Sequence, residues 1–371
     1  MPRRRCLPTL AVLMITCATA CAGSTAAPEA ARTQPSVANS PTTQPTPTLS
    51  SSTTTPTAEA GPITIAFAGD VHFEAQLRPR LRNPEAALEP IASQLSAADL
   101  TVVNLETSIG TSGTPEPKRF TFQAPPSAFD ALAAAGVDVA TMANNHGMDY
   151  GPDGLADTLA AIAADPPLAV IGVGSDANRA FAPAIIDVRG TTVAIIGAHS
   201  ADDPTADPTA HWAAGPGSPG VAVAQDPARL VEAVRAAADT ADLVVVFMHW
   251  GVQGEECPSR SQRSTARALA NAGADIVVGS HAHIVQGSGL FGDTYVAYGL
   301  GNFVWYNPNS ESASTTGLLT VTVSRGRVVA EQWAPARIQP DGLPRFAHGD
   351  DAAQIAGNLA EARDCAGLTP L

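Results

Sequence analysis

The chain has 371 residues, of which 45% are hydrophobic and 15% charged, so it can bury a sizeable core. Its formal net charge of -14 argues against general nucleic-acid binding, which requires a basic surface. No nucleic-acid partner is therefore expected.

Residues 1–21 are typical of an export signal. Arginines at positions 3–5 precede an apolar stretch at 7–15 that is too short to span a bilayer. Small residues at 18–20 before Cys21 predict cleavage in one of two ways. Either Cys21 is lipidated and holds the protein on the outer face of the cytoplasmic membrane, or the protein is simply secreted. A cysteine at the cleavage point favours the lipoprotein and a membrane contact through its lipid anchor.

Three further regions are predicted after the signal. Residues 22–61 are dominated by Ala, Thr, Pro and Ser and are expected to form a disordered stalk. Residues 62–340 contain no linker-like break and are expected to form one domain. Residues 341–371 are expected to be a C-terminal tail, with a short helix at 351–363.

Apolar strand-like runs alternate with helix-like segments along the expected domain. Strands are predicted at 63–68, 100–104, 137–141, 168–172, 184–188, 192–197, 243–248, 275–278, 295–300, 317–324 and 327–333. Helices are predicted at 85–98, 126–136, 154–164, 227–238 and 260–272. This alternation, with hairpins in the middle and at the end, predicts an α/β fold with mixed sheets.

Two cysteines remain beyond the signal and Cys21. Cys257 and Cys365 either pair in an oxidising compartment, which would attach the tail to the domain, or stay as free thiols.

Polar residues follow the predicted strands, where α/β sheets usually carry their sites. In chain order they are Asp70, His72, Glu106, Asn144, Asn145, His146, His249, His281 and His283. Taken singly, these residues could equally be turn formers or buried core histidines with a purely structural role. Together they offer oxygen and imidazole ligands, the mixture that suits Mn, Fe or Zn. The spacing of His281 and His283 would aim both imidazoles to one side if the backbone stays extended.

Six strings occur in order from Gly69 to Phe303: GDVHFE, VVNLETSIG, MANNHGMDYG, VVFMHWGVQGEE, GADIVVGSHAHIVQG and YGLGNF. With them the chain resembles the capsule-synthesis protein CapA family of poly-γ-glutamate biosynthesis, a branch of the calcineurin-like metallophosphoesterase superfamily. The resemblance implies a metallophosphoesterase-like four-layer α/β/β/α sandwich with two mixed sheets. It also implies two divalent metal ions.

The resemblance further implies a ligand set for each ion. One metal would take Asp70, His72, Glu106 and His283. The other would take Glu106, Asn145, His249 and His281. His146 would act on the substrate. Glu106 stands where the family pattern has a bridging aspartate, which puts the metal spacing in question, and many relatives lack the histidine that His72 supplies.

The resemblance implies a cell-surface protein of poly-γ-glutamate biosynthesis or export, with membrane subunits of a polymer synthase as expected partners. One reading is a dimetal hydrolase acting on an anionic phosphoester or γ-glutamyl substrate. The other is a non-catalytic accessory protein that binds or guides an anionic envelope polymer. A purely structural metal site would leave His146 without a task. Asn144, Lys118, Arg119 and Glu255 are candidate substrate contacts, although solvated loop charges explain the charged ones equally well.

Overall fold

The computed structural model describes residues 61–200 and 209–371. The predicted export signal, Cys21 and the predicted stalk up to residue 60 lie outside the described residues. Within the described part, no helix combines the length and apolar character needed to cross a membrane.

The first sheet is mixed and contains eight strands. Its central strand β1 (Ile63–Val71) pairs in parallel with β2 (Leu100–Leu105) and β15 (Asn302–Val304) and antiparallel with β16 (Thr315–Ser324). In spatial order the strands are β18 (Pro344–Phe346), β17 (Arg327–Ile338), β16 (Thr315–Ser324), β1 (Ile63–Val71), β2 (Leu100–Leu105), β5 (Val139–Thr141) and β6 (Ala169–Ile171), with β15 (Asn302–Val304) beside the end of β1.

The second sheet is also mixed and contains six strands. Its parallel centre is formed by β9, β11, β12 and β14, with β8 and β13 antiparallel at the edges. The order is β13 (Ser288–Phe291), β14 (Thr294–Ala297), β12 (Ile276–His281), β11 (Leu243–Trp250), β9 (Thr191–His199) and β8 (Ala184–Val188). Two small pairs complete the strands: β3 (Ser108–Ile109) with β4 (Gln123–Ala124), and β7 (Val173–Gly174) with β10 (Gly220–Val221).

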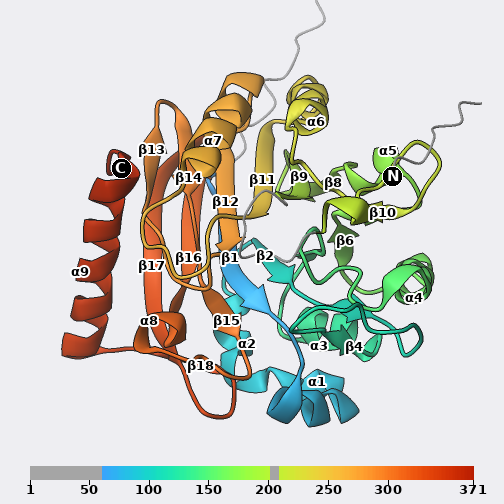
Figure 1. Ribbon diagram of the computed structural model, residues 1–371. Coiled ribbons are helices and arrows are strands. Elements are labelled where there is room, and N and C mark those ends of the chain that lie inside the picture. The colour runs from blue at the N-terminus through green and yellow to red at the C-terminus, as the bar shows by residue number, and fades with distance from the viewer. Residues whose placement is uncertain (1–60, 201–208) are drawn as a thin grey trace, which may run out of the picture. The chain divides into compact units, whose positions relative to one another are not determined.

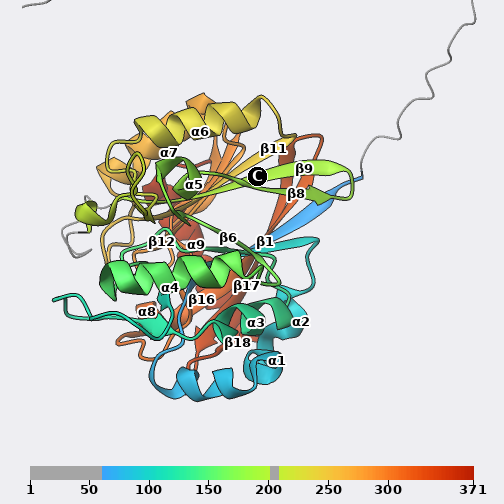
Figure 2. The same ribbon diagram turned by 90° about the vertical axis from the view of Figure 1, so that its right-hand side faces the viewer.

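Helices cover the outer face of each sheet, while α9 (Gly349–Ala366) runs along one side of the described domain (Figures 1 and 2). The longer helices are α2 (Glu89–Leu95), α3 (Ser127–Ala134), α4 (Gly151–Ala163), α6 (Ala228–Ala238), α7 (Arg260–Ala272) and α9 (Gly349–Ala366). Single turns and 3-10 segments are η1 (Ala75–Arg82), α1 (Pro84–Ala87), α5 (Ala177–Ala180), η2 (Ala210–Trp212) and α8 (Glu311–Ser314). Figure 2 shows α6 and α7 on one side of the stacked sheets and α3 and α4 on the other.

The two sheets meet across an apolar core. Phe67 of β1 and Phe247 of β11 are fully buried in this core, and each such side chain contributes about 1.5–3 kcal/mol on burial. Ala66 and Ala68, which flank Phe67 in β1, belong to a separate core that includes residues of the helices. Successive strand residues point to opposite faces of the sheet. This is the four-layer α/β/β/α arrangement, and the predicted fold class is confirmed.

Several predicted elements differ from the observed ones. The helix expected at 85–98 is two helices that meet at Leu88, because Pro90 cannot donate the backbone hydrogen bond that a continuous helix requires. In the expected tail, Pro344–Phe346 joins the first sheet, so this sheet extends beyond residue 340. The helix expected at 351–363 spans Gly349–Ala366. The short strand Asn302–Val304 was not predicted.

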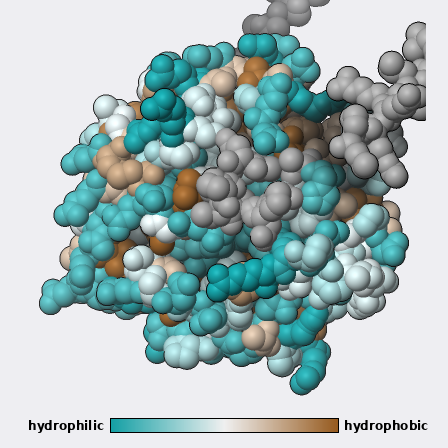
Figure 3. Space-filling view, in the orientation of Figure 1, coloured by the Kyte–Doolittle hydropathy of each residue, from teal (hydrophilic) through white to brown (hydrophobic). Residues whose placement is uncertain are grey.

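In the view of Figure 3, the visible hydrophobic residues of the described part are scattered among hydrophilic ones. The large hydrophobic side chains most exposed in the described part are Phe120, Ile185, Val329 and Leu371.

Gly69 lets the end of β1 approach the loop before β15. A Cβ atom at this position would lie 1.8 Å from the carbonyl oxygen of Gly301, and the Asp70 N–H donates to the same oxygen at 3.0 Å. The register of β1 against β2 shifts between Ala68 and Asp70. Such an irregularity turns the following side chain, which here is Asp70.

We expect Gly69→Ala to lower the free energy of unfolding by at least about 2 kcal/mol, because two backbones would have to separate. Gly357→Ala is the control, since Gly357 is exposed in α9 with no atom within 4 Å of an added Cβ. Alanine should stabilise that helix by about 0.5–1 kcal/mol. Chemical denaturation followed by circular dichroism measures both effects. Equal stabilities would show that the approach of Gly69 to Gly301 is unimportant.

Candidate metal centre

Strand ends from both sheets converge on one buried group of polar side chains. In the first sheet, Asp70 lies opposite Asn104 in β2 and opposite Asn302 in β15. In the second sheet, His249 lies between His199 of β9 and Ser280 of β12. Strand pairing therefore sets the relative positions of most of these residues.

Glu106 has the least compensated charge in this group. Both of its carboxylate oxygens are buried and, among the described residues, neither has a hydrogen-bond partner. Burial raises the pKa of Glu106 well above its usual value, and the negative charge of Asp70 raises it further. A buried carboxylate without donors is costly, so this position is suited to a bound cation.

Glu106 belongs to two groups of potential ligand atoms, in each of which all atoms lie within 4.8 Å of one another. The first group contains Glu106, His249 and His281. His249 Nε2 lies 3.0 Å from His281 Nδ1, 2.7 Å from Asn145 Oδ1 and 3.6 Å from Glu106 Oε1. Ligands about 2.0–2.1 Å from one metal ion are spaced in this way. Burial, and then the neighbouring His281, lowers the pKa of His249 and keeps it neutral, as metal binding requires.

The second group contains Asp70, Glu106 and His283. Asp70 Oδ2 lies 3.3 Å from His283 Nδ1, and the same nitrogen lies 2.8 Å from Asn302 Oδ1. Burial acts to raise the pKa of Asp70, but hydrogen bonds led by that with His283 outweigh it and hold the pKa below its usual value. Asp70 therefore remains ionised, as a ligand must be.

His72 lies outside both ligand-atom groups. Its Nδ1 faces the Glu74 N–H at 3.0 Å, and its Nε2 faces the Tyr306 N–H at 3.3 Å. Its ring stacks on Phe122 at 4.7 Å and meets the edge of Trp305 at 4.3 Å. Its assignment as a metal ligand stays a prediction.

The turn at His281 and His283 is not extended, so the condition under which the spacing would aim both imidazoles to one side is not met. The two residues have φ angles of 89° and 58°, in the left-handed region that non-glycine residues rarely adopt. The His281 N–H donates to Asp70 Oδ2 at 3.2 Å. Unfavourable backbone angles of this kind persist only where surrounding contacts enforce them, and they concentrate at functional sites.

His146 is held by a residue that the sequence analysis did not single out. Its Nδ1 lies 2.5 Å from Oδ2 of the fully buried Asp149, whose Oδ1 accepts from Lys118 Nζ at 2.8 Å. Its Nε2 lies 3.6 Å from Glu106 Oε1, and its ring stacks on Phe122 at 4.1 Å. Burial lowers the pKa of His146, although Asp149 opposes the change. Asp149 follows His146 by three residues in the MANNHGMDYG string, which was the available signal.

Asn104 and Asn144 connect the ligand-bearing loops. Asn104 Nδ2 donates to Asp70 Oδ1 at 2.8 Å and lies 3.1 Å from His249 Nδ1. Asn144 Nδ2 donates to Asn104 Oδ1 at 3.1 Å, and Asn144 Oδ1 accepts from the His146 N–H at 3.0 Å. Asn104, which was not predicted as a site residue, therefore positions two potential ligands at once.

The remaining predicted substrate contacts occupy different environments. Lys118 is largely buried and also donates to the carbonyl oxygen of Asn145 at 2.5 Å, which brings it into the centre. Arg119 is exposed, with its guanidinium 4.9 Å from the centre of the Phe120 ring. Glu255 is exposed on the loop after β11.

Two facing mixed sheets with carboxylate and imidazole groups at their strand ends define an α/β/β/α sandwich with a candidate metal centre. The family described as "Bacterial capsule synthesis protein PGA_cap" matches residues 64–307, and the chain belongs to this family.

Two of the similar proteins have descriptive names. The "PGA biosynthesis protein CapA" of Bacillus subtilis strain 168 is 38% identical over 170 residues, which are 45% of this chain and 42% of that protein. The match thus spans less than half the length of this relative. The "Probable polyglutamine synthesis accessory protein" of Mycobacterium tuberculosis strain H37Rv is 29% identical over 269 residues, which are 69% of this chain and 70% of that protein. Among solved structures, a novel phosphatase from Mycoplasma pneumoniae covers 80% of this chain and 97% of its own, with 14% identity and a TM-score of 0.47.

We expect Mn²⁺ or Zn²⁺ to raise the melting temperature of the metal-free protein, because a cation that binds only the folded state stabilises that state. At a cation concentration of a hundred times Kd, the free energy of unfolding rises by about 2.7 kcal/mol. Glu106→Gln should abolish this rise. Without metal, Glu106→Gln should be at least as stable as wild type at pH 7. Since folding raises the pKa of Glu106, wild type should lose stability relative to the variant as the pH rises from 5 to 8.

Thermal unfolding of both proteins, with and without metal, tests this expectation. Glu361→Gln, at an exposed position of α9, is the control and should respond to metal as wild type does. A metal-dependent rise that persists in Glu106→Gln would show that Glu106 is not a ligand.

Proposed function

We propose that this protein is a dimetal-dependent hydrolase that acts at the cell surface in the biosynthesis or export of a poly-γ-glutamate capsule. The observation that carries the proposal is the buried carboxylate of Glu106, which has no hydrogen-bond partner among the described residues and is shared by two groups of ligand atoms.

The proposed ligands follow those two groups. His249, His281, Asn145 and Glu106 would hold one ion, and Asp70, His283 and Glu106 the other, with His72 as its proposed fourth ligand. When bound, two divalent cations of the Mn, Fe or Zn class would supply a water of lowered pKa and a clamp for the developing oxyanion.

His146 is the proposed general acid. Asp149 engages its Nδ1, which directs Nε2 towards the side of the site where Glu106 lies. Lys118 fixes Asp149 from the other side. As the imidazolium, whose positive charge Asp149 stabilises, His146 could then donate its Nε2 proton to the departing oxygen or nitrogen.

The proposed substrate is an anionic phosphoester or a γ-glutamyl bond of an envelope polymer. Family membership and the name of the Bacillus relative support the link to poly-γ-glutamate. Export, with a lipid anchor at Cys21 and contact with membrane subunits of a polymer synthase, is part of the same proposal. The disulfide between Cys257 and Cys365 supports an oxidising location.

A second candidate is an accessory protein that binds or guides the polymer without cleaving it. The name of the mycobacterial relative, an accessory protein of polyglutamine synthesis, favours this candidate. The net charge of -14 disfavours it, because a polyanion would be repelled wherever bound cations do not offset that charge.

The two candidates differ in the effect of His146→Ala. For a hydrolase, this variant should keep the metal-dependent rise in melting temperature and lose about 10²- to 10⁴-fold in kcat on phosphoester or γ-glutamyl substrates. Steady-state assays with the metal-loaded protein measure this loss. The exposed residue His348 provides the control, and His348→Ala should retain full activity.

If metal-loaded wild type cleaves neither substrate class but binds poly-γ-glutamate, the accessory role replaces the hydrolase. An activity that survives both Asp70→Ala and His146→Ala would contradict catalysis at this centre.

A further inference from the structure

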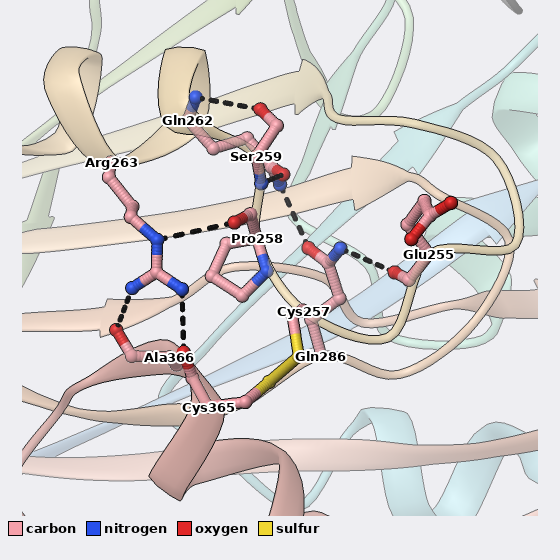
Figure 4. Close-up of a disulfide and its surroundings, with 9 residues drawn as sticks. All are labelled: Glu255, Cys257, Pro258, Ser259, Gln262, Arg263, Gln286, Cys365 and Ala366. Carbon is pink, nitrogen blue, oxygen red and sulfur yellow. Dashed lines mark hydrogen bonds between the residues drawn. A yellow bond between two sulfur atoms is a disulfide. The ribbon is translucent and has the colours of Figure 1, made fainter.

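The loop between β11 and α7, residues 251–259, lies against the turn that carries His281 and His283. The Gly254 N–H donates to the carbonyl oxygen of Ala282 at 2.9 Å, between the two histidines. Gln286 Nε2 donates to the carbonyl oxygen of Glu255 at 2.8 Å (Figure 4). This loop, here called the support loop, thus contacts the histidine turn at its centre and just beyond its end.

The support loop forms no helix or strand, although the Glu255 N–H donates to the carbonyl oxygen of Val252 at 3.1 Å within it. Gly251 and Gly254 have φ angles of 96° and 81°, and residues 253–257 are exposed. A glycine-containing exposed loop has many alternative conformations. External attachments must therefore fix its position against Ala282.

The strongest attachment is covalent. Cys257 of the support loop forms a disulfide with Cys365 of α9, across 108 residues of sequence (Figure 4). Arg263 of α7 reinforces the junction, because Nε donates to the carbonyl oxygen of Pro258 at 3.2 Å and the two Nη atoms donate to those of Cys365 and Ala366 at 2.5 Å. A guanidinium at the C-terminus of a helix is also favoured by the helix dipole.

The end of α9 is itself anchored to the sheets. Arg363 pairs with Glu331 of β17 at 2.5 Å and donates to the carbonyl oxygen of Ser288 in β13. Leu290 and Thr369 exchange backbone hydrogen bonds at 2.7 and 3.0 Å. The disulfide therefore joins an exposed loop to a fixed support.

We propose that the Cys257–Cys365 disulfide is a positioning element of the metal centre. By fixing the support loop, it keeps the Gly254 hydrogen bond on Ala282 and so helps hold His281 and His283 in their left-handed conformations, which persist only where surrounding contacts enforce them. The inference rests on the proposed function only in treating these histidines as metal ligands.

This arrangement also makes the centre sensitive to reductants. Cys257 is exposed and accessible to a dithiol. Reduction transfers two electrons and two protons from the dithiol, breaks the S–S bond, and yields two protein thiols and one oxidised cyclic dithiol. The support loop is then released from α9.

The test uses the full chain with both cysteines replaced, Cys257→Ser with Cys365→Ser. In metal-free protein, hydrogen exchange of residues 279–286 should become faster than in wild type. Affinity for Zn²⁺ or Mn²⁺ alone, measured by calorimetry, should fall about 10- to 100-fold, as for other losses of groups that support metal ligands. Arg337→Gln is the matched control, because Arg337 holds the opposite end of α9 through Asp351 at 2.8 Å and should leave both readouts unchanged.

Unchanged exchange at residues 279–286 would overturn the proposal, as would unchanged metal affinity despite faster exchange. If the double variant does not fold, wild type treated with a dithiol and then reoxidised provides the same exchange comparison. If wild type binds neither metal, the proposed function fails, whereas the exchange measurement still decides whether the disulfide positions the turn.

Discussion

The burial of Glu106 without a hydrogen-bond donor from the described part of the chain is the constraint on which the rest of the centre depends. A negative charge in this position needs a positive partner. Its neighbours include a second carboxylate, Asp70, and the imidazoles of His249 and His146, whose pKa values burial lowers. The side chains around Glu106 therefore offer lone pairs that can bind a cation, but little positive charge to balance its carboxylate. The polar interior of this sandwich is therefore incomplete as protein alone, and its stability is linked to the cations available where the protein works.

The strands that bear the site could be predicted because their apolar runs are long and β-branched. The run at 243–248 became β11, and the run at 63–68 became β1 with three further residues. Strand Asn302–Val304 escaped prediction because it is only three residues long and is held by pairing with β1. Pro90 was a visible signal that the predicted helix at 85–98 would break.

The composition of the site was easier to predict than its geometry. Recurrence of polar residues at successive strand ends identified His249 and Glu106, and the structure brings both within one ligand-atom group. The left-handed turn at His281 could not be predicted, because contacts with distant residues enforce it. Nor could spacing decide whether Cys257 and Cys365 pair, since their proximity depends on how α9 packs. Asn104 ends the predicted strand at 100–104 but was assigned no role, because its contacts with Asp70 and His249 join parts of the chain that are distant in sequence.

The placement of β1 has a consequence for how the molecule assembles. This first strand of the domain lies between β2, its neighbour along the chain, and β16, which begins about 240 residues after β1 ends. Such non-local pairing slows folding, because the conformational entropy of a large loop is lost before the stabilising contacts form. The amino-terminal half can supply Asp70 and Glu106 early, but their sheet lacks one side of its central strand until nearly the whole chain is present. The centre is therefore a late product of folding, and a chain truncated before β16 would carry every one of its ligands without the sheet that aligns them.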